Sequence, residues 1–201
     1  KYLALRLALG EGAALGLGAR LPVLLPLSVY ATALADKDVP LHRFIAQYYQ
    51  DSGLDEPLGD LLDEALRRGG ALLLLDGLDE VRSVEMRHTV VARVMDFFAY
   101  WQQYGNKFVL TSRIVGYREV RPMGTRMAEC TLVDFDDAEI TQFVTRWTAA
   151  LEREARGANE VAVWEAAQEQ AGLLNSIQHN PGVRQLAANP LLLTILALMK
   201  R

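Results

Sequence analysis

The spacing of hydrophobic residues predicts strands that alternate with helices over roughly the first two thirds of the chain. Ala71 to Leu75 is an uninterrupted aliphatic run that stops at Asp76, a pattern typical of a strand buried on both faces of a parallel sheet. Lys107 to Thr111 is the next predicted strand, and Ala128 to Leu132 is a weaker one. Because stretches with helical spacing separate these runs, the pattern favours an α/β layered domain.

Leu21 to Val29 is a further strand-like stretch, apolar and partly β-branched. It contains Pro22 and Pro26. Proline has no N–H group to donate to a neighbouring strand, so these two residues predict an outer strand or a strand with irregular edges.

Four stretches in the first part of the chain have helical spacing: Tyr2 to Leu9, Leu41 to Gln50, Leu58 to Arg68 and Val84 to Tyr104. The first of them is apolar nearly all round, and we therefore expect it to be a buried helix. Gly69 and Gly70 end the third, as glycine commonly does at the carboxyl end of a helix.

After Asp134 the pattern becomes helical throughout. One helical face is shared by the apolar residues Ile140, Phe143, Val144 and Trp147. Asp136 is the predicted N-cap of this helix, with Glu139 completing a capping-box arrangement. Further helices are predicted over Glu160 to Gln178 and Pro190 to Lys200, and Asn180-Pro181-Gly182 is the predicted turn between them. A domain boundary is therefore expected near residue 135.

Composition and charge narrow the class of protein. The 201-residue chain has 51% hydrophobic and 23% charged residues, typical of a soluble globular protein. Its formal net charge of -4 argues against direct contact with nucleic acid, which needs a clustered basic surface. Cys130 is the only cysteine, so an intrachain disulfide is excluded and a reducing, cytoplasmic setting is favoured. No run reaches the roughly 18 apolar residues of a spanning helix, and we expect no membrane association.

The residues after the central aliphatic run carry the most specific chemistry. Asp76, Asp79 and Glu80 crowd into one short stretch, and Gly77 permits a tight turn within it. Open α/β sheets bind ligands outside the carboxyl ends of their strands, where these carboxylates are expected to lie. An aliphatic run followed by a lone acid is equally well explained by ordinary loop residues or helix caps, but the complete string is more specific.

The string from Leu72 to Glu80 resembles the extended Walker B motif of NACHT-type NTPases, which belong to the STAND class of P-loop NTPases. The family's pattern of four aliphatics, Asp, Gly, an aliphatic, Asp and Glu is matched at every position. The resemblance implies ATP or GTP and Mg²⁺ as cofactors, with Asp76 holding the metal, usually through water. It also implies that Glu80 orients or deprotonates the attacking water, with Asp79 as a second acid that shares this work.

Two later stretches extend the resemblance. Phe108 to Arg113 is similar to the family's sensor strand, whose closing arginine lies near the terminal phosphate, so Arg113 is the implied sensor of the γ-phosphate. Leu186 to Leu193 resembles the family's Asn-Pro-Leu motif, in which the proline, here Pro190, packs near the adenine base. Pro190 is explained equally well as the first residue of a helix, and both interpretations stay open.

The resemblance implies a three-layer, P-loop NTPase-like α/β fold with a mostly parallel sheet. Residues 1–135 would be a truncated NACHT nucleotide-binding core, and residues 136–201 the start of a small helical subdomain. The family's glycine-rich phosphate-binding loop is missing, because Lys1 to Ala8 match the helix just after it. We therefore expect a sheet without its first strand and loop, and very weak nucleotide binding and no activity by these residues alone.

Two functions from different classes fit these features. One is an ATP-dependent signalling switch, in which nucleotide binding and hydrolysis control a conformational change and oligomerisation. Its expected partners are nucleotide, further copies of the parent's NTPase domain, and flanking sensor and effector domains of the same chain. The alternative is a NACHT-like scaffold or interaction module that does not hydrolyse nucleotide. A Gly-x-x-x-x-Gly-Lys-Ser/Thr string directly before Lys1 is the feature that would favour the switch.

Overall fold

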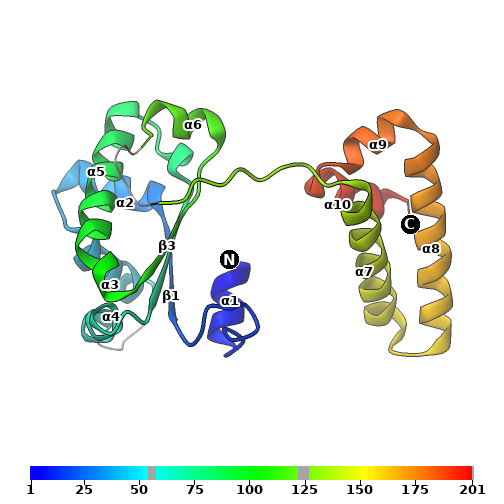
Figure 1. The fold of residues 1–201 in the computed structure, drawn as a ribbon, viewed down its shortest axis with the longest axis horizontal. Coiled ribbons are helices and arrows are strands. Elements are labelled where there is room, and N and C mark those ends of the chain that lie inside the picture. The colour runs from blue at the N-terminus through cyan, green and yellow to red at the C-terminus, as the bar shows by residue number, and fades with distance from the viewer. Residues whose placement is uncertain (54–57, 122–126, 201) are drawn as a thin grey trace. The chain divides into compact units, whose positions relative to one another are not determined.

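The computed structural model describes residues 1–53, 58–121 and 127–200 (Figure 1). Internal contacts divide the chain into two compact units, Lys1–Met127 and Ala128–Arg201, and each unit is described by itself. This division falls somewhat before the boundary near residue 135 that the sequence predicts. None of the helices within the described ranges is long and apolar enough to cross a membrane.

The first unit is built on a parallel sheet of three strands in the order β1-β2-β3. These strands are β1 (Leu21–Pro26), β2 (Ala71–Asp76) and β3 (Lys107–Leu110). The central strand, β2, is buried from Ala71 to Leu75, and only Asp76 at its carboxyl end is exposed. The prediction of an α/β domain with a buried, parallel central strand is therefore confirmed.

Helices cover both faces of this sheet, because successive side chains of a strand point to opposite faces (Figure 1). On one face Leu72 and Leu74 pack against Leu7 of α1 (Tyr2–Ala8). On the other, Leu73 and Leu75 belong to the main core, together with residues of four helices. These helices are α2 (Leu27–Asp36), α3 (Leu41–Asp51), α4 (Leu58–Arg67) and α5 (Val84–Trp101). The first unit is thus layered, with a helix, a sheet and a group of helices.

The outer edge of β1 is closed by prolines and by a tyrosine hydroxyl. Pro22 and Pro26 lie in β1, which pairs with β2 alone among the described strands, as the sequence predicts. The Tyr49 hydroxyl accepts a hydrogen bond from Leu24 N (2.9 Å) and donates one to Leu24 O (2.8 Å). Burial raises the pKa of Tyr49, which keeps this hydroxyl protonated. The open edge is therefore satisfied where a further strand would otherwise pair.

A buried amide joins three segments at the amino-terminal side of the sheet. Asn106 lies directly before β3 and is 6% exposed. Its Oδ1 accepts a hydrogen bond from Ala71 N at 3.1 Å. Its Nδ2 donates to Leu66 O at 2.8 Å and to Trp101 O at 3.0 Å. One side chain thus holds together the start of β2 and the ends of α4 and α5.

The second unit is a group of four helices: α7 (Asp137–Arg156), α8 (Glu160–His179), α9 (Pro181–Ala187) and α10 (Pro190–Met199). The long helices α7 and α8 pack side by side as a hairpin (Figure 1). The core of this unit contains Ile140 and Val144 of α7, Leu173 and Ile177 of α8, and Leu193 of α10. The change to helical structure is therefore confirmed.

Four local predictions are wrong. Residues 128–132 form no strand, because they pair with no other strand and Leu132 is fully exposed. The first helix is not buried on all sides, since Tyr2 and Leu5 face solvent and Leu7 is its one fully buried residue. The stretch Leu27 to Val29 begins α2 instead of continuing the strand. Asn180-Pro181-Gly182 is a helix start, because Asn180 Oδ1 caps α9 and proline fits the first turn.

Candidate functional site

The candidate site lies on two turns that follow neighbouring parallel strands. One turn begins at Asp76, the last residue of β2, and continues into a 3-10 helix, η1 (Leu78–Glu80). The other runs from Thr111, which follows β3, into α6 (Ile114–Glu119). Because β2 and β3 are parallel and adjacent, their carboxyl ends bring both turns to the same edge of the sheet.

Thr111 joins the two turns. Its Oγ1 donates a hydrogen bond to Asp76 Oδ1 at 2.5 Å and accepts one from Gly77 N at 3.0 Å. Its carbonyl oxygen accepts a further bond from Leu78 N at 3.0 Å. The Asp76 carboxylate is therefore oriented by the neighbouring strand, while the residue itself stays exposed. Thr111 belongs to the predicted sensor motif, but nothing in the sequence indicates its contact with Asp76.

Gly77 makes the acidic turn possible. Its φ angle of 76° lies in the left-handed region, which side chains other than glycine rarely adopt. A Cβ atom at this position would lie 2.8 Å from the Glu80 carboxyl carbon. Leu78, which is fully buried, anchors the turn to the core. The backbone conformation thus requires glycine here, and a larger residue would also displace the Glu80 side chain.

Asp79 and Arg113 form the second connection between the turns. Asp79 Oδ1 accepts a hydrogen bond from Arg113 N at 2.9 Å, and Arg113 Nε lies 3.4 Å from Asp79 Oδ2. The Asp79 side chain is 19% exposed, whereas that of Arg113 is 89% exposed. Gly116 of α6 packs closely on Asp79, since a Cβ there would lie 2.6 Å from the Asp79 Cβ. Asp79 therefore holds the sensor turn in place and presents Arg113 to solvent.

Arg87 of α5 is a further connection, which the sequence analysis did not identify. Its guanidinium group donates to Val81 O at 2.7 Å and to Asp79 O at 3.4 Å. It also forms an ion pair with Glu119 of α6 at 2.5 Å. Arg87 thus ties the acidic turn to the helix that follows Arg113. Two of its partners are backbone oxygens, which carry no side-chain pattern, and the third, Glu119, lies 32 residues away in the sequence, so no local pattern could have identified it.

The exposed acids fit a hydrated magnesium ion better than a cage of protein ligands. Among the residues that the structure describes, no group of three or more His, Cys, Asp or Glu side chains could hold a metal. Magnesium keeps several waters and is usually bound by one or two carboxylates together with substrate phosphates. Asp76, which is exposed and fixed by Thr111, suits such a role. Glu80 is also exposed and lies on the same turn.

Pro190 belongs to the second unit, and its place relative to the other four candidate residues is not defined. It is exposed and occupies the first turn of α10. The side chain of Asn189 accepts hydrogen bonds from Leu191 N (3.0 Å) and Leu192 N (3.2 Å). Asn189-Pro190 is therefore a helix start, and the adenine contact of Pro190 stays a prediction.

Comparison of this chain with family models, curated proteins and solved structures finds no match. The motif and its geometry are therefore what indicates the function of this chain. The structure brings Asp76, Asp79, Glu80 and Arg113 together at one edge of the sheet.

Proposed function

We propose that the first unit is the acidic and sensor half of an ATPase site of NACHT type, within a protein that works as a nucleotide-dependent signalling switch. The observation that carries this proposal is the pairing of the two turns through Thr111 to Asp76 and through Asp79 to Arg113. A motif of ordinary loop acids does not require a neighbouring strand to orient its carboxylates. Such orientation is what a metal and phosphate site needs before the nucleotide arrives.

Each residue then has a distinct role. Asp76 holds Mg²⁺ through water, and the ion supplies charge that stabilises the phosphates of ATP or GTP. Glu80 accepts the proton of the attacking water. Arg113 neutralises negative charge on the γ-phosphate, which competes with Asp79 for the guanidinium group. Asp79 positions Arg113 and the sensor turn, and its implied role as a second acid beside Glu80 stays a prediction.

The switch itself follows from this competition. When a γ-phosphate attracts Arg113, Asp79 loses a partner that holds α6 in place. The nucleotide state is thereby coupled to the position of α6, which Arg87 also binds through Glu119. The partners proposed for such a switch are further copies of the NTPase domain and flanking sensor and effector domains, in the cytoplasm.

A scaffold without hydrolysis is the second candidate. The ion pair between Arg113 and Asp79 favours it, because a protein that only needed a stable surface would also keep the two turns bonded to each other. The rate of ATP hydrolysis distinguishes the two functions. A switch hydrolyses ATP and changes its assembly with the nucleotide, whereas a scaffold does neither.

The test compares two variants of the full-length protein. Asp76→Asn should abolish the Mg²⁺-dependent part of ATP binding, measured by calorimetry. Glu80→Gln should keep ATP binding and lower phosphate release by about 10²-fold or more, the usual contribution of a general base. The matched controls are Asp60→Asn and Glu64→Gln on α4, which make the same chemical changes at exposed positions away from the site. Equal activity in the variants and their controls would overturn the proposal.

A further inference from the structure

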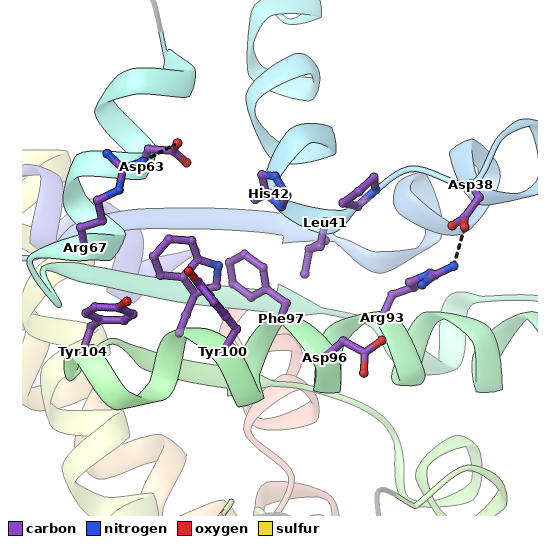
Figure 2. Close-up of a pocket in the computed structure, with 12 residues that line it drawn as sticks. Asp38, Leu41, His42, Asp63, Arg67, Arg93, Asp96, Phe97, Tyr100 and Tyr104 are labelled. Atoms are coloured by element: carbon purple, nitrogen blue, oxygen red, sulfur yellow. Dashed lines mark hydrogen bonds and ion pairs between the residues drawn. The ribbon is translucent and has the colours of Figure 1, made fainter.

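A second concave site lies in the first unit, away from the acidic turn. It is a groove of about 670 Å³ between α3, α4 and α5, closed at one end by the 3-10 helix η2 (Gln102–Tyr104) (Figure 2). None of the four residues Asp76, Asp79, Glu80 and Arg113 lines it. Pockets for small molecules typically have volumes of about 300–1,000 Å³, so the groove has the size of a ligand site.

One wall of the groove is a stripe of aromatic rings. Phe97, Tyr100, Trp101 and Tyr104 recur at helical spacing along α5 and η2, so they share one face. The Tyr100 and Trp101 ring centroids are 4.8 Å apart, and those of Trp101 and Tyr104 are 5.6 Å apart. Phe97 is part of the core, but Tyr100 is 57% exposed and Tyr104 is 42% exposed. Packing of the core therefore does not account for the two tyrosines.

The charged residues of the groove are paired with one exception. Arg93 Nη2 lies 2.5 Å from Asp38 Oδ2, and Arg67 Nη2 lies 3.4 Å from Asp63 Oδ2 (Figure 2). Asp96 lies on α5 between Arg93 and the aromatic stripe and is exposed. It forms no hydrogen bond or ion pair with any residue in the described part of the chain. A carboxylate without a partner among the described residues therefore lies beside a wall of aromatic rings.

We propose that this groove binds a small organic cation, with an ammonium or guanidinium group beside Asp96 and an apolar body against Tyr100 and Trp101. The faces of aromatic rings attract cations, and a carboxylate next to them adds a charge of the right sign. An anion would meet both the negative ring faces and Asp96, so the groove discriminates against it. This binding site is independent of the nucleotide function proposed for the acidic turn.

The three tryptophans of the chain provide the readout. Trp101 lines the groove, whereas Trp147 and Trp164 belong to the second unit and act as internal controls. The protein is labelled with ¹⁵N at the indole nitrogens and titrated with three probes of similar size. These are 2-phenylethylamine as the cation, 2-phenylethanol as the neutral analogue and 3-phenylpropionate as the anion. The expected result is a saturable shift of the Trp101 signal, tightest with the amine and weakest with the carboxylate.

Two variants assign the preference to the groove. Asp96→Asn should weaken binding of the amine by up to about fivefold, the upper range for an exposed ion pair, and leave the alcohol unchanged. Tyr100→Leu keeps an apolar surface but removes a ring, so it should lower the ratio of amine to alcohol affinity. Asp60→Asn, an exposed acid of α4 that does not line the groove, is the matched control and should change nothing.

Three outcomes would overturn the proposal. The first is equal affinity for the amine, the alcohol and the carboxylate, which would show that the groove does not select charge. The second is a shift of Trp147 and Trp164 that matches the shift of Trp101, which would show non-specific binding. The third is an equal effect of Asp96→Asn and Asp60→Asn on the affinity for the amine.

Discussion

Each of the two units of this chain has its own internal contacts, and the kinds of hydrogen bond within them differ. In the second unit, the side chains of Asp136, Asn159, Asn180 and Asn189 each cap a helix by accepting hydrogen bonds from its first N–H groups. In the first unit, Ser83 caps α5 in this way, whereas α1, α2, α3 and α6 have no side-chain cap. The helices of the second unit thus begin with bonds between residues close in sequence, although distant residues such as Arg184 and Asp137 also pair there.

The first unit relies instead on contacts between distant residues. Strand pairing joins β1 to β2 and β2 to β3, and Asn106 and Tyr49 bind backbone groups far away in the sequence. The same kind of contact builds the candidate site, where Thr111 orients Asp76 and Arg113 binds Asp79. Long-range polar contacts therefore accompany the proposed chemistry, and local caps accompany the helical unit that lacks the acidic motif.

The largest expected effect comes from removing a long-range contact. Asn106→Leu keeps the approximate volume but removes the side-chain bonds to Ala71 N and Trp101 O, and leaves Leu66 O with Gly69 N as its remaining partner. We expect the free energy of unfolding to fall by about 3 kcal/mol or more, since each buried polar group without a partner costs about 1–3 kcal/mol. Urea unfolding followed by the Trp101 indole signal measures this change. An unchanged midpoint would show that the amide is not a structural link.

Alkaline pH should also lower the stability of the first unit more than that of the second. Burial raises the pKa of Tyr30 to about 12, with smaller opposing effects of Arg93 and Asp38, and its hydroxyl donates to Val39 O at 2.9 Å. The folded state keeps this proton above pH 10, where the unfolded state loses it. The contribution of Tyr30 to the free energy of unfolding is fully present below pH 10 and is lost as the pH rises towards 12. The loss is about 1 kcal/mol per pH unit after allowance for solvent screening.

The second unit serves as the reference for this prediction, because all seven tyrosines of the sequence precede residue 128. The Trp101 signal should therefore report a steep loss of stability above pH 10, and the Trp147 signal a shallower one. Tyr30→Phe should flatten the dependence seen at Trp101. The same slope in the wild type and in Tyr30→Phe would contradict the assignment to Tyr30.

The smallest effect is expected in the second unit. Asp136 Oδ1 accepts a hydrogen bond from Glu139 N at 2.8 Å, and Glu139 Oε2 accepts one from Asp136 N at 3.0 Å. Asp136→Ala should lower the free energy of unfolding by about 1 kcal/mol, the usual contribution of an N-cap. The Trp147 signal in urea measures it, with Asp134→Ala as a control, since Asp134 is exposed and caps no helix. A similar loss in both variants would exclude capping as the cause.

This contrast also explains which parts of the fold could be predicted. The start of α7 was predicted because its capping box lies within four consecutive residues. The outer position of β1 was predicted from its prolines, although the part played by Tyr49 was not. Residues 128–132 have the composition of a strand, but a strand also needs a partner, and these residues have none in the described part of the chain. The prediction of a turn at Asn180 was wrong because residues typical of turns also begin helices, and Asn180 caps α9.

The candidate site shows the same limit. Asp76, Asp79 and Glu80 were identified because they occur together in one contiguous motif, and Arg113 because it closes a second motif. Their mutual contacts depend on the register between β2 and β3, which no local pattern encodes. For that reason the sequence could not distinguish the partly buried, bonded Asp79 from the exposed Glu80. Arg87 was missed because it acts through backbone oxygens and Glu119.

The central claim is that Asp76 belongs to a magnesium-nucleotide site. The most direct test is the affinity of the full-length protein for ATP, measured with Mg²⁺ and again with excess chelator, in the wild type and in Asp76→Asn. We expect Mg²⁺ to strengthen ATP binding to the wild type and to have no such effect on the variant. If Mg²⁺ strengthened ATP binding equally in both proteins, or in neither, the acidic turn would not be a metal site and the proposed function would be wrong.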